Sequence, residues 1–386
     1  MIRSSRLLAP FSLSVLALTS CANAETGESA PVAAEGTPFA VAEMGEFNEP
    51  WAIEFAPGTA VLFVTEKSGT MKFLDTASGA IGTVSGLPDV DYGGQGGLGD
   101  IVFLPSEASD TLERRTIYLS WAEAGDGDTR GAVVGKGSLV CGEADACAIE
   151  GLDVIWRQTP KVTGRGHYSH RLGISPDGQH LWIASGERQK MQPSQDTSNT
   201  LGTMVRLNLD GRPAAGNPLA DKGGASAEIW SYGHRNILGM DWDAQGRLWE
   251  VEHGPAGGDE LNLVQRAANY GWPVRSNGEH YNGDPIPDHS ADDGFAKPAL
   301  SWNPVIAPGD MIIYSGELFD AWQGQALIPG LGSQALVRVA LEGDTAREVA
   351  RYEFDARLRS IEQGPDGAIW IAEDGEDGQV LKLTPQ

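Results

Sequence analysis

The stretch Ala244-Gln245-Gly246-Arg247-Leu248-Trp249-Glu250-Val251 joins a tight turn to a short strand with an aromatic side chain at its centre. A glycine-containing turn that leads into an aromatic strand is typical of a β-hairpin. The same order of turn and strand occurs twice more, at Pro176-Asp177-Gly178 before Leu181-Trp182-Ile183-Ala184 and at Pro365-Asp366-Gly367 before Ala368-Ile369-Trp370-Ile371-Ala372. These three copies predict a fold built from repeated hairpins.

The spacing of the copies indicates the size of the repeated unit. The first two turns are about 70 residues apart and the last two about twice 60, so the roughly 345 residues after residue 38 hold about six units. Further short strand-like runs occur at Val61-Leu62-Phe63-Val64 and Thr116-Ile117-Tyr118-Leu119-Ser120-Trp121, without long helical periodicity. Four-stranded units of this size are typical of propellers, whereas a two-sheet sandwich rarely uses so many residues. We therefore predict an all-β, six-bladed β-propeller.

The composition excludes several classes of function. The 386 residues carry a formal net charge of −25, which opposes binding to nucleic acid and to anionic lipid surfaces. Hydrophobic residues make up 41% of the chain, enough for a packed core, and the 50 glycines suit many turns. An anionic ligand of such a protein needs a local cluster of cationic side chains.

The N-terminus has the pattern of a secretory signal. Arg3 and Arg6 precede an apolar run over residues 7–18 that is too short to span a membrane permanently. Leu18-Thr19-Ser20-Cys21 resembles the lipobox of bacterial lipoproteins, in which the cysteine becomes the lipidated first residue. Ala22-Asn23-Ala24 instead fits ordinary signal peptidase cleavage. Both endings predict export to the periplasm.

These patterns divide the chain into three parts. We expect a signal peptide over residues 1–20, or 1–24 with ordinary cleavage, followed by a flexible tether up to residue 38 that is rich in Ala, Glu, Gly, Ser and Pro. The propeller domain is expected over residues 39–386. A lipid on Cys21 is the only membrane attachment that we predict.

Two further cysteines, Cys141 and Cys147, lie close together in the sequence. In an exported protein such a pair predicts a local disulfide. A metal site would need additional ligands nearby, and the intervening residues offer only acids.

Two glycine-rich stretches carry candidate polar groups. Gly93-Gly94-Gln95-Gly96-Gly97-Leu98 leaves Gln95 as its one polar side chain, and no clear helix follows, which argues against a phosphate loop. His167 lies in the stretch Gly164 to Leu172 just before a strand, where it can act as a general base because its ordinary pKa lies near neutrality. His170 is a second candidate for that role.

Cationic and oxygen-donor side chains form two further groups. Arg235 can clamp a carboxylate, and the alternation of Arg357-Leu358-Arg359 places two arginines on one strand face, which favours an anion between them. Hard oxygen ligands of the kind that Ca²⁺ prefers occur in the following stretch, on Asp259 and Glu260 and as carbonyls around Gly254, Pro255 and Tyr270.

With these motifs together, the chain resembles the soluble pyrroloquinoline quinone (PQQ)-dependent sugar dehydrogenases, a family that includes bacterial aldose sugar dehydrogenase. The resemblance covers nearly all of the chain after residue 38. Its strongest parts are Ser231-Tyr232-Gly233-His234-Arg235-Asn236, Glu252-His253-Gly254-Pro255, Gly257-Gly258-Asp259-Glu260-Leu261-Asn262 and Asn269-Tyr270-Gly271-Trp272-Pro273. Further matches are Asn48-Glu49-Pro50-Trp51, Gly94-Gln95-Gly96-Gly97-Leu98, Gly166-His167 and Arg357-Leu358-Arg359.

The resemblance implies a six-bladed propeller that oxidises the anomeric carbon of an aldose to a lactone, with hydride transfer to PQQ. It implies that His167 is the general base and that Gln95 and Arg235 contact the reacting oxygens. It implies the following cofactor contacts: Arg235, Asn236, Tyr281, Arg357 and Arg359. It further implies a Ca²⁺ held with PQQ by the Gly254 and Pro255 carbonyls, and a second Ca²⁺ bound by Glu260 and Tyr270. The electron acceptor is not indicated.

Two positions depart from the family pattern. Relatives often have an acid just before the catalytic histidine to orient it, where this chain has Gly166. Relatives also commonly carry a cofactor-binding lysine after a leucine near the end of the fifth blade, and Pro329-Gly330-Leu331-Gly332-Ser333 has none. Alternative functions are therefore a Ca²⁺-dependent propeller lactonase and a non-enzymatic propeller that binds a sugar or a protein.

Overall fold

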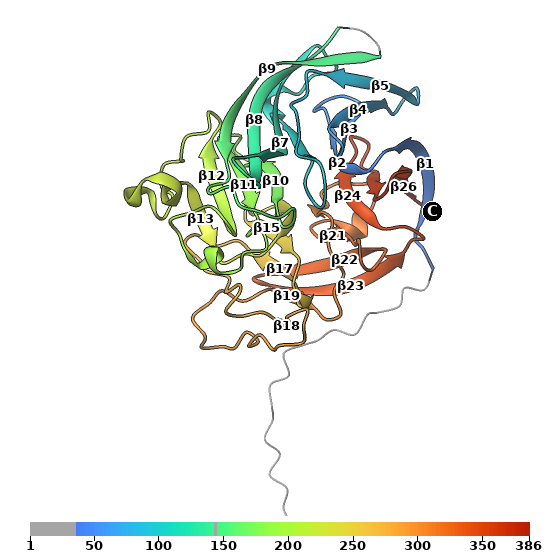
Figure 1. The fold of residues 1–386 in the computed structure, drawn as a ribbon. Coiled ribbons are helices and arrows are strands. Elements are labelled where there is room, and N and C mark those ends of the chain that lie inside the picture. Colours follow the sequence, from blue (N-terminus) through green and yellow to red (C-terminus); the bar gives the residue numbers. More distant parts are fainter. Residues whose placement is uncertain (1–35, 143–144) are drawn as a thin grey trace, which may run out of the picture.

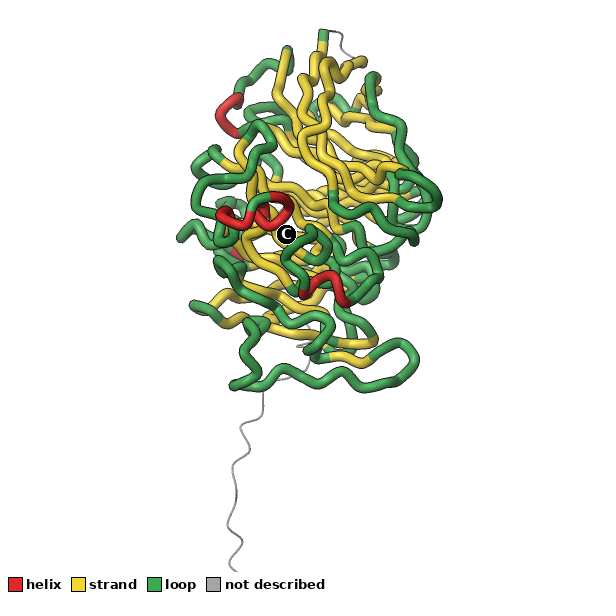
Figure 2. Tube along the Cα trace, turned by 60° about the vertical axis from the view of Figure 1, so that its left-hand side comes forward, coloured by secondary structure: helices red, strands yellow, loops and turns green. Residues whose placement is uncertain are grey.

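Strands make up almost all of the regular secondary structure, as the computed structural model shows for residues 36–142 and 145–386 (Figures 1 and 2). The predicted signal peptide, Cys21 and nearly all of the tether lie outside these described residues. No helix in the described ranges is long and apolar enough to cross a membrane. Their only helices are short 3₁₀ turns: η1 (Pro105–Glu107), η2 (Gln192–Gln195), η3 (Ala220–Lys222), η4 (Gly224–Glu228) and η5 (Asp320–Trp322).

Four of the sheets have four strands each. Three of them are antiparallel meanders of strands that follow one another along the chain. The first contains β10 (Ser169–Ile174), β11 (His180–Ser185), β12 (Thr203–Asn208) and β13 (Ile229–Tyr232). The second contains β14 (Ile237–Trp242), β15 (Leu248–Glu252), β17 (Asp259–Leu263) and β19 (Leu300–Trp302). The third contains β20 (Ile312–Ile313), β21 (Ala326–Pro329), β22 (Ala335–Glu342) and β23 (Thr345–Glu353). The short strands β16 (Ala256–Gly257) and β18 (Gly278–Glu279) pair separately.

The fourth of these sheets joins the two ends of the domain. The N-terminal strand β1 (Phe39–Phe47) pairs antiparallel with the C-terminal strand β26 (Gly378–Pro385), beside β25 (Ile369–Glu373) and β24 (Leu358–Gln363). Figure 1 shows β1 in blue against β26 in red. This pairing links the first strand to the last sheet, so the backbone groups of β26 do not remain as a free edge there.

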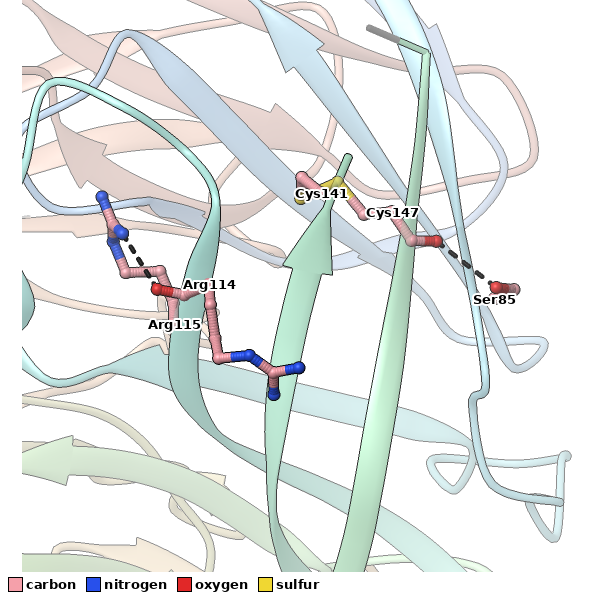
Figure 3. Close-up of a disulfide and its surroundings, with 5 residues drawn as sticks. All are labelled: Ser85, Arg114, Arg115, Cys141 and Cys147. Atoms are coloured by element: carbon pink, nitrogen blue, oxygen red, sulfur yellow. Dashed lines mark hydrogen bonds between the residues drawn. A yellow bond between two sulfur atoms is a disulfide. The ribbon is translucent and has the colours of Figure 1, made fainter. Parts of the chain in front are cut away.

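The remaining sheet has eight strands and contains two meanders. One is β2 (Pro50–Phe55), β3 (Val61–Glu66), β4 (Thr70–Asp75) and β5 (Ala80–Ser85). The other is β6 (Leu98–Phe103), β7 (Arg114–Ala124), β8 (Arg130–Cys141) and β9 (Ala146–Arg157). They are joined by the parallel pair β5–β9, in which Ser85 lies opposite Ala148. The predicted disulfide between Cys141 and Cys147 is present and links β8 to β9 at this junction (Figure 3).

The three turn-and-strand copies form hairpins as predicted. Each turn connects the first two strands of a sheet: β10 to β11, β14 to β15 and β24 to β25. Their turn glycines Gly178, Gly246 and Gly367 all have positive φ, the region that glycine enters without steric cost. The aromatic residues that follow, Trp182, Trp249 and Trp370, are buried between neighbouring sheets.

The first strands of the meanders surround a central channel. Strand β2 contacts β6, β6 contacts β10, β10 contacts β14, β14 contacts β20, β20 contacts β24, and β24 contacts β2. Residues at or before the starts of these strands line one cavity, of about 280 Å³. Residues at their ends line a second cavity, of about 360 Å³. The fold is therefore all-β and propeller-like, with two chemically different channel ends.

Candidate active site

The cavity at the strand starts is lined by four of the residues predicted to contact substrate or cofactor. Gln95, Asn236, Arg357 and Arg359 line it, each at the start of a first strand or just before one. Trp51, His253 and Asp374 also contribute to its wall. The chain brings these groups together because the first strands all begin at the same end of the channel.

His167 is buried beside this cavity and makes two polar contacts. Its Nδ1 lies 2.5 Å from Oε1 of Glu187, and its backbone N–H donates to Oε1 of Gln95 at 2.6 Å. Burial lowers the pKa of His167, the hydrogen bond that its ring donates to Glu187 opposes that change, and the charge of Arg235 lowers the pKa further. The imidazole therefore stays neutral to lower pH than an exposed histidine does.

Glu187 provides the acidic partner that the sequence analysis did not find beside His167. The position before the histidine is Gly166, but Glu187 lies 20 residues later, just beyond the end of β11, and is fully buried. Burial raises its pKa, but the hydrogen bond and charge of His167 outweigh this effect, with help from the Met191 N–H, and the pKa lies below its usual range. The acid that orients His167 therefore comes from another loop and not from the position before the histidine. The sequence signal that could have identified Glu187 is an acidic residue directly after a strand that ends near the same channel end.

The backbone around His167 is held in an unusual conformation. Two segments, residues 167–170 and 188–191, contain most of the non-glycine residues with positive φ in the described chain: His167, Ser169, His170, Arg188, Gln189 and Met191. This left-handed region costs energy for side chains with a Cβ, so the surrounding structure must enforce it. Arg188 contributes by donating hydrogen bonds to the carbonyl oxygens of Gly166 and Arg130.

His170, the second candidate base, occupies a different environment. Its ring stacks on Trp51 at 4.7 Å between centroids, and its Nδ1 lies 3.0 Å from Oγ of Ser120. Burial, followed by the charge of Arg171, lowers the pKa of His170 to about 3. A neutral, packed ring of this kind supports the cavity wall, and His167 has the better geometry for proton transfer.

Arg235 lies near His167, Asn236 follows Arg235 in the chain, and Tyr281 contacts Arg235. The Arg235 guanidinium donates to the His253 carbonyl at 3.0 Å and to Oη of Tyr281 at 3.1 Å, while its buried Nε has no protein partner. Oδ1 of Asn236 accepts from Ser169. Tyr281 is 77% exposed, so only its contact with Arg235 ties it to the site. The unpaired Nε of Arg235 is a donor available to a bound anion.

Arg357 and Arg359 share one face of the chain, as the alternation predicted. Both donate to Asp374, with Nε to oxygen distances of 2.9 Å. The anion between the arginines is thus a carboxylate of the protein, and the two guanidinium groups remain at the cavity wall.

Three of the four predicted metal residues line a third, smaller cavity: Gly254, Glu260 and Tyr270. Glu260 is buried and pairs across the sheet with Glu252, while Glu250 pairs with Asn262. Asp259, also considered as an oxygen ligand, has a structural role here, because its carboxylate accepts hydrogen bonds from the N–H groups of Gly254 and Ala307. Pro255 is buried in the same loop.

Beside Glu260, two further carboxylates are buried around one imidazole, a cluster that the sequence analysis missed. Ligand atoms of His234, Glu250 and Glu252 lie within 4.8 Å of one another. Burial lowers the pKa of His234, but hydrogen bonds that its ring donates to Glu250 and Glu252 outweigh this effect and raise the pKa to about 9. Oε2 of Glu250 and Oδ1 of Asn262 are buried without partners. Excess buried anions with free oxygen atoms fit a cation such as Ca²⁺. The signal was the alternation of Glu250 with Glu252 on one strand face.

The cavity at the opposite channel end is acidic. Five carboxylates face it, with Arg171 as the one cationic residue of its lining: Glu54, Asp100, Asp241, Asp310 and Glu362. Burial raises the pKa of Asp100 and of Asp241 to about 6. Such an environment repels anions, so an anionic ligand is favoured only at the end that carries the arginines.

The comparisons with known proteins agree with this geometry. The sequence matches the family described as glucose/sorbosone dehydrogenase over residues 47–382. It is 34% identical to aldose sugar dehydrogenase YliI of Escherichia coli over 346 residues, which cover 88% of this chain and 91% of that protein. The apo crystal structure of the soluble aldose sugar dehydrogenase from Escherichia coli superposes with a TM-score of 0.83 at 33% identity, covering 90% of this chain and 100% of that one.

A structure with bound cofactor is also similar. The PQQ-bound aldose sugar dehydrogenase from Streptomyces coelicolor has a TM-score of 0.71 at 25% identity, covering 92% of this chain and 100% of that one. A match that spans nearly the whole folded domain, in sequence and in structure, shows common descent of the entire domain. The chain belongs to the glucose/sorbosone dehydrogenase family.

Proposed function

We propose that this protein is a quinoprotein aldose dehydrogenase, which oxidises the anomeric carbon of an aldose to the lactone with PQQ as hydride acceptor. The observation that carries the proposal is His167, a buried imidazole bonded to Glu187 beside a cavity that holds Arg357 and Arg359. Family membership supports the same chemistry. A base next to an anion-binding cavity is the minimum that this reaction requires.

His167 is the proposed general base. Because Nδ1 is bonded to the carboxylate of Glu187, Nδ1 carries the proton and Nε2 is left as the acceptor. Nε2 then takes the proton of the anomeric hydroxyl as the carbonyl forms, a contribution of about 10² to 10⁴ in rate. Gln95 and Arg235 are proposed to hold the reacting oxygens, since Gln95 is bonded to the backbone of His167 and Arg235 lies beside it.

The cationic residues of the site fit PQQ, which carries three carboxylates. Arg235 offers an unpaired buried Nε, and Arg357 and Arg359 stand at the cavity wall. Asn236 and Tyr281 are proposed as further contacts. When bound, PQQ would supply the hydride acceptor, and a Ca²⁺ held with it would supply Lewis-acid polarisation.

The metal residues are proposed to hold two Ca²⁺ ions. The carbonyls of Gly254 and Pro255 would hold the ion at the cofactor. Glu260 and the carbonyl of Tyr270 would hold the second, where the buried carboxylate excess supports a cation. His234 stacks on the Tyr270 ring at 4.4 Å between centroids and keeps this wall in place.

We further propose that the domain has six blades and is exported. Six blades result when the eight-stranded sheet is divided at its one parallel pair, β5–β9, because every unit then begins with a channel-lining strand. The lipobox-like sequence supports a lipid anchor on Cys21 in the periplasm, and the disulfide is compatible with an oxidising compartment.

The test is reconstitution with a matched pair of variants. Apo-protein mixed with PQQ and CaCl₂ should reduce an artificial dye with one or more of a panel of aldoses. His167→Ala should lower kcat by about 10²-fold or more and leave PQQ affinity nearly unchanged. The control His180→Ala removes a histidine from the opposite end of its sheet and should retain full turnover. Dye reduction by His167→Ala at the rate of the unaltered protein would refute the role of the base, and PQQ-independent lactone hydrolysis would indicate a lactonase.

A further inference from the structure

Lys67 is a cation at the cavity wall that neither the motifs nor the proposed function uses. It directly follows β3, in the turn that leads to β4, and lines the same cavity as Gln95 and the two arginines. Its Nζ lies 3.2 Å from Oε1 of Glu49 and 5.6 Å from the centroid of the Tyr92 ring. The Tyr92 hydroxyl donates to the other Glu49 oxygen.

The stem of Lys67 is fixed by the glycine-rich loop that carries Gln95. The Lys67 carbonyl accepts the N–H of Leu98, and a Cβ on Gly97 would lie 2.0 Å from that carbonyl oxygen and 2.9 Å from Lys67 Cγ. Only glycine allows this approach, and Gly97 also has a positive φ of 151°. The loop therefore orients the Lys67 side chain and positions Gln95 at the same time.

Lys67 decides the net charge of the cavity wall. The charged lining groups are the cations Lys67, Arg357 and Arg359 and the acids Glu49 and Asp374. The arginines share Asp374 and Lys67 pairs with Glu49, so the wall carries one net positive charge with Lys67 and none without it. In a protein of net charge −25, a neutral wall would offer little attraction to an anionic ligand.

Lys67 lies in a turn whose counterpart in another sheet has no cationic side chain at the cavity. The β3–β4 turn joins the second and third strands of its meander, as the β21–β22 turn does in another sheet. Leu331, in the β21–β22 turn, lines the same cavity but is apolar. Equivalent turns from several sheets thus reach one cavity, and Lys67 is the one lysine or arginine that these turns place in its lining.

We propose that Lys67 binds a carboxylate of the anionic cofactor, with Glu49 holding the ammonium group in place before the cofactor arrives. This assignment rests on the proposed function. The stretch 329–333 has no lysine, and in this assignment the β3–β4 turn supplies the cation instead. Lys67 is a binding residue in this role and takes no part in proton transfer.

The experiment measures PQQ affinity directly. Apo-protein with fixed CaCl₂ is titrated with PQQ, and tryptophan fluorescence is followed, since Trp51 lines the cavity. Lys67→Gln should raise Kd about tenfold, the effect of one charge-assisted hydrogen bond, and should reduce its dependence on salt. Lys67→Arg should stay within about threefold of the unaltered protein.

Lys382→Gln is the matched control. It changes net charge by the same amount, but Lys382 pairs with Asp366 in the turn at the opposite channel end. Circular dichroism verifies that each variant is folded. Equal affinity of Lys67→Gln and the unaltered protein would overturn the assignment and leave the proposed function standing. An equal loss of PQQ affinity in Lys382→Gln would also overturn the assignment, because it would show that affinity follows the overall charge of the protein. Absence of PQQ binding by the unaltered protein would overturn the proposed function and this assignment together.

Discussion

Glu187→Gln should slow sugar oxidation without weakening cofactor binding. The substitution keeps the shape of the side chain but removes the negative charge that lies 2.5 Å from His167 Nδ1. It also disturbs the carboxylate oxygen that accepts the N–H groups of Lys190 and Met191. An amide cannot satisfy all three donors, because one of its two polar atoms is itself a donor.

The size of the effect follows from the burial of the pair. The side chains of His167 and Glu187 are 8% and 1% exposed, so water screens their interaction little. A hydrogen bond to a charged group contributes about 1.5–3 kcal/mol, and this one strengthens as the imidazole gains a proton in the transition state. Its loss should therefore lower kcat about 10- to 100-fold, at a cost of 1.36 kcal/mol per factor of ten.

The pH profile separates this role from a loss of stability. Glu187 raises the pKa of His167, whereas burial and Arg235 lower it. Without the charge of Glu187, burial and Arg235 still lower the pKa of His167, so the acid limb of kcat/KM should move to lower pH. The assay is dye reduction from pH 4 to 9 by reconstituted enzyme, with Glu228→Gln as control because Glu228 is an acid bonded to Trp156 elsewhere in the fold. Full turnover and an unshifted acid limb in folded Glu187→Gln would refute the reasoning.

Three other predictions concern the metal, the N-terminus and the acidic channel end. A strong chelator should lower Tm, because an ion bound only by the folded state stabilises that state by about 2.7 kcal/mol at a hundredfold excess over Kd. The Glu260→Gln variant should melt at this lower temperature whether or not chelator is present. An unchanged Tm in the presence of chelator would reject the cation site. Mass spectrometry of the mature protein should find a lipidated Cys21 as first residue, whereas an unmodified start at Glu25 would show ordinary cleavage. Burial, and then the charge of Asp100, raises the pKa of Glu54 well above its usual range, so the folded state holds this proton more tightly and loses stability as pH rises. Glu54→Gln should raise Tm by about 2–4 °C at pH 8 and leave it unchanged near pH 4, and an equal change at both would contradict this account.

The hairpins could be predicted from the sequence because their information is local. The turns at residues 176–178, 244–246 and 365–367 combine a glycine with a following aromatic strand, and both features act within a few residues. The pairing of β1 with β26 could not be predicted in this way, since it joins residues more than 300 positions apart. The parallel contact of β5 with β9 likewise depends on how two meanders pack.

The candidate site shows the same division. His167, Arg235 and the Arg357–Arg359 alternation stand out in glycine-rich or cation-poor surroundings. Glu187 and Lys67 do not, because an acid after a strand and a lysine in a turn are common on protein surfaces. Their importance comes from being brought to one channel end by different sheets, a property of the fold as a whole.

Arg171 explains how a site for anions can share a channel with five carboxylates. Its guanidinium lies 4.4 Å from the centroid of Trp51, which lines the cationic cavity, and 3.2 Å from Asp100, which lines the acidic one. Further hydrogen bonds to the Leu238 and Gly309 carbonyls fix the group across the channel. Arg171 is buried, so its charge is not dispersed in solvent and acts on both sides. It offsets part of the repulsion among the carboxylates and places a positive charge beneath the floor of the cationic cavity. The carboxylates at the acidic end can then make the protein more negative overall, while the cavity above them still attracts an anionic cofactor.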